Sequence, residues 1–203
     1  MILSPKVSEK YKNDKVNSIL ECAKAVFIIK GFDETTMQDI VDACKISRGG
    51  LYRYFSSTEE IFKAVLEADL SKDEDVFSNL INSSLSTVEI LKLFIEEEKL
   101  NILNIRNTII PATYEFFIKN IRNNIEIDYL KKRHAYALAS LNRVIEYGIT
   151  RGEFTKIIPN DISIFIINFI EGLIITAISV GIDEVYIEGQ IKIFNKFIQS
   201  ILV

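Results

Sequence analysis

The sequence predicts an all-α protein of about nine helices, in which a small head of short helices precedes a larger helical body. Three observations support this fold class. Apolar residues recur at helical spacing along most of the 203 residues, and no segment alternates as a strand would. The chain has 3 prolines and 8 glycines, mostly at expected helix ends. Hydrophobic residues make up 48% of the chain, which suffices for a sizeable core.

The first helix is expected over residues 9–30. It ends before Gly31, a residue type that is common just after helix C-termini. One face of this helix carries apolar side chains spaced three and four residues apart, which indicates a buried stripe. These residues are Val16, Ile19, Leu20, Ala23, Val26 and Phe27.

Residues 36–55 predict two short helices joined by a tight turn. Thr36 caps the first helix, and Asp39 stands where the second half of a capping box is expected. The turn follows at Lys45, and Ser47 is the expected cap of the second helix. Two helices joined in this way form a helix-turn-helix, whose second helix enters the major groove of DNA.

Ser57 and Glu60 predict a capping box for a fourth helix that continues past residue 70. Pro111 and Pro159 stand in expected first turns, where proline is tolerated. Apolar periodicity predicts five further helices, over residues 87–105, 111–122, 125–151, 159–181 and 184–202.

The charge balance is unusual for a protein that binds nucleic acid. The net charge is -4 and the sequence pI is near 5.2. Residues 1–58, however, carry nine lysines and arginines against seven acidic residues, so this segment is +2. DNA binding depends on the local field at the groove, and the acidic total therefore does not exclude it.

Other features favour a cytoplasmic location. Cys22 and Cys44 fall inside expected helices without metal-ligand spacing, so we expect small buried hydrophobes in a reducing compartment. The first ten residues lack the apolar core of a signal peptide. Residues 162–182 are long and apolar, but Asn168 and Glu171 interrupt them. A buried helix is therefore expected there, with no membrane partner.

Residues 16–66 resemble the DNA-binding head of the TetR family of bacterial transcriptional regulators. The body is similar to that family more weakly, at Phe116-Phe117, at Arg151 to Phe154 and at Glu171-Gly172-Leu173. In the head, the resemblance rests on Ile19 to Ala23, Phe27, Gly31-Phe32, Thr35-Thr36, Ile40, Ser47, Leu51-Tyr52, Tyr54-Phe55 and Ser57 to Glu60.

The resemblance implies a homodimer that binds a palindromic operator as a ligand-responsive repressor and is released by a small effector. It implies a DNA-binding domain over residues 12–72 and an effector-binding and dimerisation domain over residues 73–203. The acidic, aromatic body favours a lipophilic or cationic effector. A transcriptional activator or a corepressor-dependent regulator of the same fold is the alternative. No cofactor or metal is implied.

The head departs from the family pattern at the turn and at the start of the fourth helix. Lys45 occupies a turn position that is often glycine in the family, which implies a modest strain. Thr58 replaces a lysine that often binds phosphate in the family, and Arg53 can supply the missing charge.

Several head residues are expected to contact DNA. Arg48 begins the recognition helix and reaches either a guanine edge or a phosphate. Gly49 and Gly50 either admit close approach of the backbone to DNA or begin a frayed helix. Tyr54 either binds phosphate, as expected for Tyr52, or packs under the fourth helix. The predicted DNA-binding residues are Thr36, Gln38, Ser47, Arg48, Gly49, Tyr52, Arg53, Tyr54 and Thr58.

Two sets of body residues are candidates for effector binding and dimerisation. Polar and aromatic side chains could line a pocket, although aromatics at helical spacing equally fit a plain core. They are Tyr114, Phe117, Tyr136, Tyr147, Asn168 and Glu171. The last helix carries apolar residues spaced 4, 3, 4 and 3, typical of a seam between helices, either between subunits or within one. The predicted dimer interface comprises Phe165, Phe169, Leu173, Ile187, Ile191, Phe194, Ile198 and Ile201.

Two other classes of protein compete with a regulator. An enzyme is not expected, because the sequence shows no nucleophile with a paired base, no glycine-rich phosphate loop and no metal-ligand cluster, and it has 1 histidine. A small-molecule carrier could be built from the body alone. Such a carrier, however, would not need Arg48, Tyr52 and Tyr54 on an exposed helix.

Overall fold

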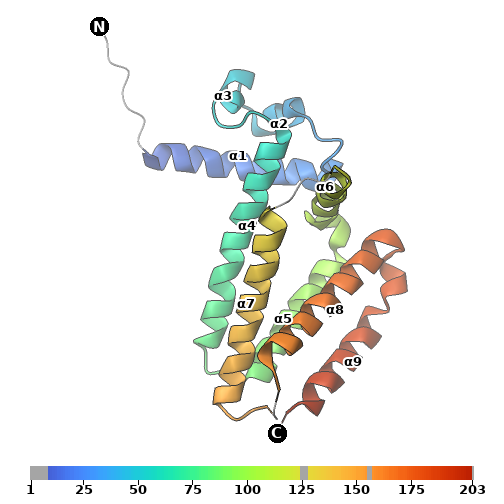
Figure 1. The fold of residues 1–203 in the computed structure, drawn as a ribbon. Coiled ribbons are helices and arrows are strands. Elements are labelled where there is room, and N and C mark those ends of the chain that lie inside the picture. The colour runs from blue at the N-terminus through green and yellow to red at the C-terminus, as the bar shows by residue number, and fades with distance from the viewer. Residues whose placement is uncertain (1–8, 124–127, 155–156, 203) are drawn as a thin grey trace. The chain divides into compact units, whose positions relative to one another are not determined.

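The computed structural model is all-α, as predicted, and describes residues 9–123, 128–154 and 157–202 (Figure 1). Within these residues it contains nine α-helices and two short 3₁₀ helices. In chain order these are α1 (Glu9–Lys30), α2 (Met37–Cys44), α3 (Arg48–Tyr52), α4 (Thr58–Ile81), α5 (Thr87–Leu103), η1 (Ile105–Asn107), α6 (Ile110–Arg122), α7 (Asp128–Thr150), α8 (Pro159–Ser179), η2 (Ile182–Val185) and α9 (Ile187–Ser200).

The expected helices agree with these bounds within a few residues. The last helix begins at Ile187 rather than at residue 184, because residues 182–185 form the 3₁₀ turn η2. The predicted start of the long helix at residue 125 lies outside the described residues, in which α7 begins at Asp128.

Contacts divide the chain into two compact units, and the division falls inside α4. The head unit comprises Met1–Asp69 and Ile109–Ile125, and the body unit comprises Leu70–Thr108 and Glu126–Val203. The helix α6 therefore belongs to the head unit by its contacts, although it follows α5 in the sequence. The predicted boundary between residues 72 and 73 assigned α6 to the body, because sequence order alone does not show which core a helix joins.

The core of the head unit is a cluster of four phenylalanine rings from four segments. Phe27 lies on α1, Phe32 on the loop that follows it, Phe62 on α4 and Phe116 on α6. Ring centroids lie 4.7 Å apart for Phe27 and Phe62, 4.9 Å for Phe32 and Phe62, and 4.9 Å for Phe32 and Phe116. All four rings are buried. Such pairs stabilise a core by about 0.5–1.5 kcal/mol each beyond the area they bury.

Polar contacts hold α6 against the loop that links α1 to α2. Glu115 Oε2 accepts a hydrogen bond from the Phe32 amide at 2.6 Å, and Lys119 Nζ lies 2.7 Å from Asp33 Oδ1. Gly31 makes the close approach possible, because a Cβ on it would lie 2.6 Å from Glu115 Oε2. Its φ of +79° also favours glycine, so two separate constraints act on this position.

The body unit is a helical bundle in which α7 packs on α8 and α5 contacts α7, α8 and α9. The loop after α7 completes the bundle at the start of α5. Glu153 Oε2 accepts a hydrogen bond from the Thr87 amide at 2.8 Å, and Arg151 Nε donates to Glu153 Oε1 at 2.6 Å. One carboxylate thereby satisfies an amide of the first turn of α5, which no helical carbonyl can reach.

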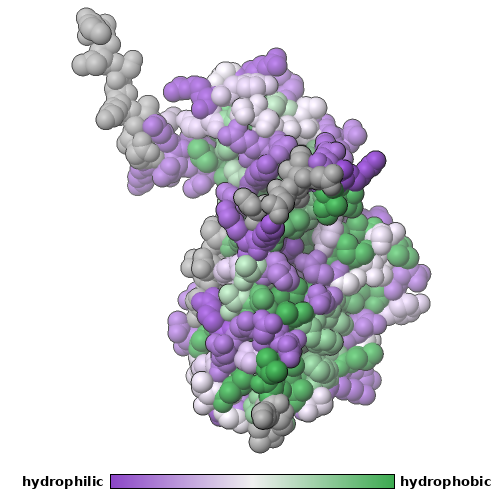
Figure 2. Space-filling model, in the orientation of Figure 1, coloured by the Kyte–Doolittle hydropathy of each residue, from purple (hydrophilic) through white to green (hydrophobic). Residues whose placement is uncertain are grey.

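Among the described residues, α8 is the one helix long and apolar enough to cross a membrane. One side of it packs into the body core through Ser163, Ile166, Ile167, Ile170, Ile174 and Ala177. Hydrophobic side chains gather on the visible face of the body unit, whereas the visible face of the head unit is mostly hydrophilic (Figure 2). The apolar character of α8 thus has two components, a buried face and an exposed one.

The two cysteines are free thiols in the head unit and are half-buried, slightly more open than expected. Cys44 Sγ lies 3.9 Å from the carbonyl oxygen of Ile19, where α2 packs on α1. Burial, together with the neighbouring Cys22 thiol, raises the pKa of Cys44 to about 12. This thiol is therefore protonated at neutral pH and packs as a small apolar group.

Candidate nucleic-acid interface

The start of α2 is fixed by the capping box that the sequence predicts. Thr36 Oγ1 accepts a hydrogen bond from the Asp39 amide at 3.2 Å, and Asp39 Oδ2 accepts one from the Thr36 amide at 2.9 Å. Lys30 Nζ lies 2.8 Å from Asp39 Oδ1 and connects the end of α1 to this cap. The hydrogen bond from Lys30 is the main reason that the pKa of Asp39 falls to about 2. Asp39 is therefore ionised at neutral pH, and Lys30 neutralises its charge.

The turn between α2 and α3 is built on a left-handed residue. Lys45 has φ 52° and ψ 43°, and its amide donates to the carbonyls of Asp42 and Val41. Ile46 donates to Val41 at 3.3 Å and closes the end of α2. The left-handed region is costly for a residue with a Cβ, so the expected strain at this lysine is confirmed.

The recognition helix α3 has five residues and depends on its cap and on one buried side chain. Ser47 Oγ accepts a hydrogen bond from the Gly50 amide at 3.1 Å, and the Leu51 side chain is fully buried. The opposite side of α3 is exposed and carries Arg48 and Tyr52. The Arg48 guanidinium lies 5.6 Å from the centre of the Tyr52 ring, and Tyr52 is 43% exposed. A planar cation and a phenol thus lie together on the free face of α3.

The two glycines of α3 have different surroundings. A Cβ on Gly50 would lie 3.0 Å from Ser47 Oγ and would crowd the cap. A Cβ on Gly49 would meet no atom within 4 Å, and this residue is exposed. The described part of the chain therefore gives a reason for Gly50 but none for Gly49.

The remaining predicted DNA-binding residues differ in their exposure. Gln38 is exposed, and its amide nitrogen donates to Asp42 Oδ1 at 2.7 Å. Arg53 is exposed, whereas Tyr54 and Thr58 are half-buried. We call the exposed residues Thr36, Gln38, Arg48, Gly49, Tyr52 and Arg53 the recognition surface.

The predicted capping box of α4 is half present. The Glu60 amide donates to Ser57 Oγ at 3.1 Å, as predicted. The Glu60 carboxylate instead accepts from the amide of Ser56 at 2.6 Å and from its hydroxyl at 2.7 Å. A long carboxylate can reach either of two adjacent amides, and the sequence pattern alone does not distinguish them.

The six predicted effector residues are divided between the two units. Tyr114 and Phe117 lie on α6 in the head unit, where Phe117 is buried. Tyr136 and Tyr147 lie on α7, and Asn168 and Glu171 lie on α8. Glu171 pairs with Arg133 at 3.3 Å, and Asn168 is exposed. The Tyr136 hydroxyl is buried and has no hydrogen-bond partner among the described residues.

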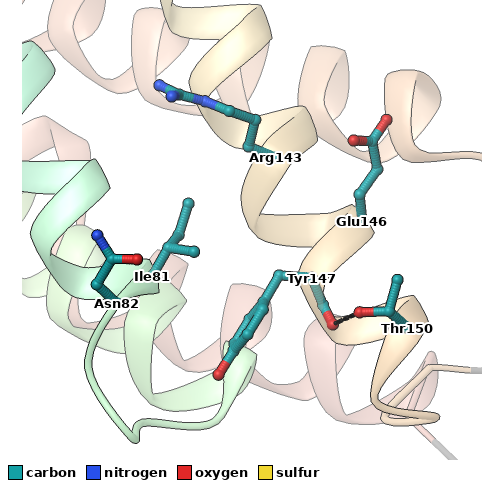
Figure 3. Close-up of a pocket in the computed structure, with 6 residues that line it drawn as sticks. All are labelled: Ile81, Asn82, Arg143, Glu146, Tyr147 and Thr150. Carbon is teal, nitrogen blue, oxygen red and sulfur yellow. Dashed lines mark hydrogen bonds between the residues drawn. The ribbon is translucent and has the colours of Figure 1, made fainter.

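Of these six residues, Tyr147 lines the cavity of about 420 Å³ that Figure 3 shows in the body unit. The other lining residues were not predicted. They are Ile81 and Asn82 at the end of α4, and Arg143, Glu146 and Thr150 on α7. Residues 143, 146, 147 and 150 follow helical spacing, so their shared face was visible in the sequence. The sequence did not show, however, that this face of α7 lies beside the end of α4.

The seam predicted for the dimer interface packs mostly inside its own chain. Ile187, Ile191, Phe194 and Ile198 are buried, each with 8% or less of its surface exposed. Phe169 stacks on Phe194 with ring centroids 5.2 Å apart. These four α9 residues therefore offer little surface to a second copy. Within its own chain α9 contacts α5, and Phe194 contacts Phe169 of α8, so the role of these four residues in a dimer stays a prediction.

Other predicted interface residues remain accessible. Phe165 is 43% exposed, and Phe169, Leu173 and Ile201 are half-buried. Ile193 and Ile175, which were not predicted, are 63% and 46% exposed. The exposed apolar surface of α8 and α9 thus includes one predicted residue, Phe165, and two that were not predicted, Ile175 and Ile193.

Comparison with known proteins identifies both parts of the chain. Residues 19–65 match the family of bacterial regulatory proteins of the tetR family, and residues 89–188 match the tetracyclin repressor-like C-terminal domain. A crystal structure of a TetR transcription regulator from Haloarcula marismortui is similar with a TM-score of 0.77. It is 20% identical and covers 94% of this chain and 100% of its own. At that identity the similarity shows the fold.

Two curated relatives are similar over nearly the whole chain. The uncharacterized HTH-type transcriptional regulator YfiR of Bacillus subtilis is 31% identical, over 98% of this chain and 98% of its own. The HTH-type transcriptional regulator QacR of Staphylococcus aureus is 25% identical, over 92% and 95%. Together with the capped helix-turn-helix, these matches show that the chain belongs to the TetR family and is a DNA-binding transcriptional regulator rather than an enzyme.

Proposed function

We propose that the protein is a cytoplasmic repressor that binds a palindromic operator as a homodimer and is released by a small effector. The observation that carries the proposal is the recognition surface. The Ser47 cap and the buried Leu51 hold α3, while Arg48 and Tyr52 remain exposed beside Gly49, on which a Cβ would meet no atom within 4 Å. Such a face is suited to a ligand that approaches from outside, and the major groove accepts a helix.

Four residues of the recognition surface and two of their neighbours, Ser47 and Tyr54, have distinct roles in the proposal. Arg48, in the first turn of α3, reads a base edge, because a guanidinium can bond both acceptors of a guanine. The hydroxyls of Tyr52 and Tyr54 bind phosphate oxygens and set the register of the head. Gln38 and the amides at the start of α2 bind a further phosphate. The caps at Thr36 and Ser47 orient these groups.

A second copy of the chain is proposed to cover the exposed apolar face of α8 and α9. On α8, Phe165, Gly172 and Ile175 share one face by helical spacing, and on α9 Gly189 and Ile193 share another. A Cβ on either glycine would meet nothing within 4 Å, so each leaves room for a neighbouring helix. In the proposed dimer the two recognition helices bind successive major grooves of the operator, about 34–36 Å apart.

Release by an effector is proposed to act through the segments that join the two units. The chain passes between the units within α4 and on either side of α6. The cavity lined by Arg143, Glu146 and Tyr147 lies beside the end of α4 and is our candidate effector site. An effector that prefers one arrangement of these helices shifts the dimer toward it. Operator affinity falls only to the extent of that preference.

The first prediction concerns the recognition surface. Arg48→Ala should weaken binding to an operator found by footprinting genomic DNA by at least about tenfold, since each guanine contact contributes about 1–3 kcal/mol. Adding Tyr52→Ala should weaken it further. Gel shifts against a nonspecific duplex measure the effect, and Lys92→Ala, an exposed charge on α5, is the matched control. Equal binding by the double variant and the wild type would refute the site.

The second prediction concerns Gly49. Gly49→Ala should leave the stability of the free protein unchanged or raise it by up to about 1 kcal/mol, because the methyl group meets no atom and alanine favours helices. Operator affinity should nevertheless fall if the backbone approaches the DNA closely. Thermal unfolding and binding titration separate the two effects. An unchanged affinity would show that Gly49 lies away from the groove.

The third prediction concerns the dimer. Phe165→Asp and Ile193→Asp should each raise the dimer dissociation constant at least about tenfold, because two-fold pairing buries both copies of the new charge. Sedimentation velocity over a concentration series measures it. Leu93→Asp introduces the same charge at a 50% exposed position on α5 and should leave the dimer intact. Dimers of unchanged stability in both variants would exclude this face.

The fourth prediction concerns release. Heads crosslinked on the operator at the operator-competent spacing should resist every compound that releases the uncrosslinked protein. The crosslink holds the operator-competent spacing and removes the alternative state. Operator occupancy by fluorescence anisotropy measures this. Release of the crosslinked dimer at the same effector concentration would contradict a mechanism based on spacing.

A further inference from the structure

The left-handed turn residue of the helix-turn-helix is a lysine, and this choice contrasts with other helix ends in the chain. Gly31 and Gly152, with φ of +79° and +70°, follow the ends of α1 and α7. Among the described residues, Lys45 and Tyr186 are the two non-glycine residues with positive φ. A strained residue that persists at a functional element suggests a function for its side chain.

The Lys45 ammonium forms no ion pair with the described residues of the head unit. Lys45 is exposed, and no carboxylate of the described residues pairs with it. The two nearest acidic residues in the sequence have other partners. Asp42 accepts from the Gln38 amide at 2.7 Å, and Asp39 pairs with Lys30 at 2.8 Å. The side chain of Lys45 is therefore available to an external anion.

The position of Lys45 brings that charge close to the recognition surface. Lys45 precedes Arg48 by three residues, so their Cα atoms lie at most about 11 Å apart. The major groove is about 12 Å wide, and phosphates line both of its edges. A lysine that flanks the N-terminus of a helix inserted there can extend its flexible stem to one of these phosphates.

We propose that Lys45 is a phosphate-contacting residue of the operator complex, and that this contact is why a lysine occupies the left-handed turn. The inference rests on the proposed use of α3 as the recognition helix. It adds a residue outside the recognition surface to the DNA contacts. Because phosphate carries no sequence information, Lys45 contributes affinity and register rather than base discrimination.

A structural role for the same lysine would leave a different signature. A cation at the C-terminus of α2 interacts favourably with the helix dipole, and this would stabilise the free protein. Such an effect changes the unfolding midpoint but not the number of counterions released on DNA binding. A phosphate contact changes the salt dependence of binding, by a slope of about 0.9 for each contact.

Three substitutions at Lys45 separate the effect of the left-handed backbone from the effect of the positive charge. Lys45→Gly and Lys45→Asn both remove the cation and tolerate the left-handed conformation, whereas Lys45→Arg keeps the cation. Lys92→Ala on α5 is the control for loss of a distant exposed charge. Operator affinity is measured for each full-length protein from about 0.05 to 0.3 M salt, together with the thermal unfolding midpoint.

The proposal predicts that Lys45→Gly and Lys45→Asn lower affinity roughly five- to thirtyfold near 0.15 M salt. They should reduce the slope of log affinity against log salt by about 1 per subunit. Their unfolding midpoints should not fall, and Lys45→Arg and Lys92→Ala should keep the wild-type slope. An unchanged slope in both uncharged variants would overturn the proposal. If Arg48→Ala still weakened binding in that case, the proposed function would stand; if it had no effect either, the recognition surface itself would be refuted.

Discussion

The packing of four phenylalanine rings is the contact on which the rest of the head depends. Phe27, Phe32, Phe62 and Phe116 come from segments up to 89 positions apart in the numbering, and their burial fixes α1, its following loop, α4 and α6 as one body. The loop that carries Phe32 leads directly into the cap of α2. The orientation of the helix-turn-helix is therefore set by this cluster, because the loop cannot move without separating the rings.

Short-range contacts stabilise the recognition helix α3, whereas the ring cluster sets the orientation of the helix-turn-helix. A helix of five residues is unstable by itself, since the cost of nucleation exceeds the gain from so few bonds. Three other features stabilise α3, because its own helical hydrogen bonds do not suffice. They are the Ser47 cap, the buried Leu51 and the left-handed Lys45. These contacts lie on the inner side of α3, which leaves the outer side entirely available. Rigid support and a free outer face together suit the helix to reading a groove.

The membership of α6 in the head unit bears on the release by an effector that we propose. Glu115 and Lys119 hold α6 to residues 31–33, and both ends of α6 continue into the body unit. A change in the body that displaces α6 must break these bonds or carry the loop with it. That loop precedes the Thr36 cap, so a displacement would reach the recognition surface through a few covalent links. Such a linkage is reciprocal, and operator binding would oppose the same displacement.

Local patterns in the sequence determined the helices, the caps at Thr36 and Ser47, the turn at Lys45 and the exposed residues of α3. They could do so because these features depend on hydrogen bonds and apolar spacing within about four residues. Tertiary structure decided the partners of each face. It placed the apolar seam of α9 inside its own chain, moved the Glu60 carboxylate to Ser56, joined α6 to the head and paired the end of α4 with α7 at the cavity. Apolar spacing in the sequence predicts that one face of a helix is buried. The residues that bury this face are distant in the sequence, so the spacing does not identify them.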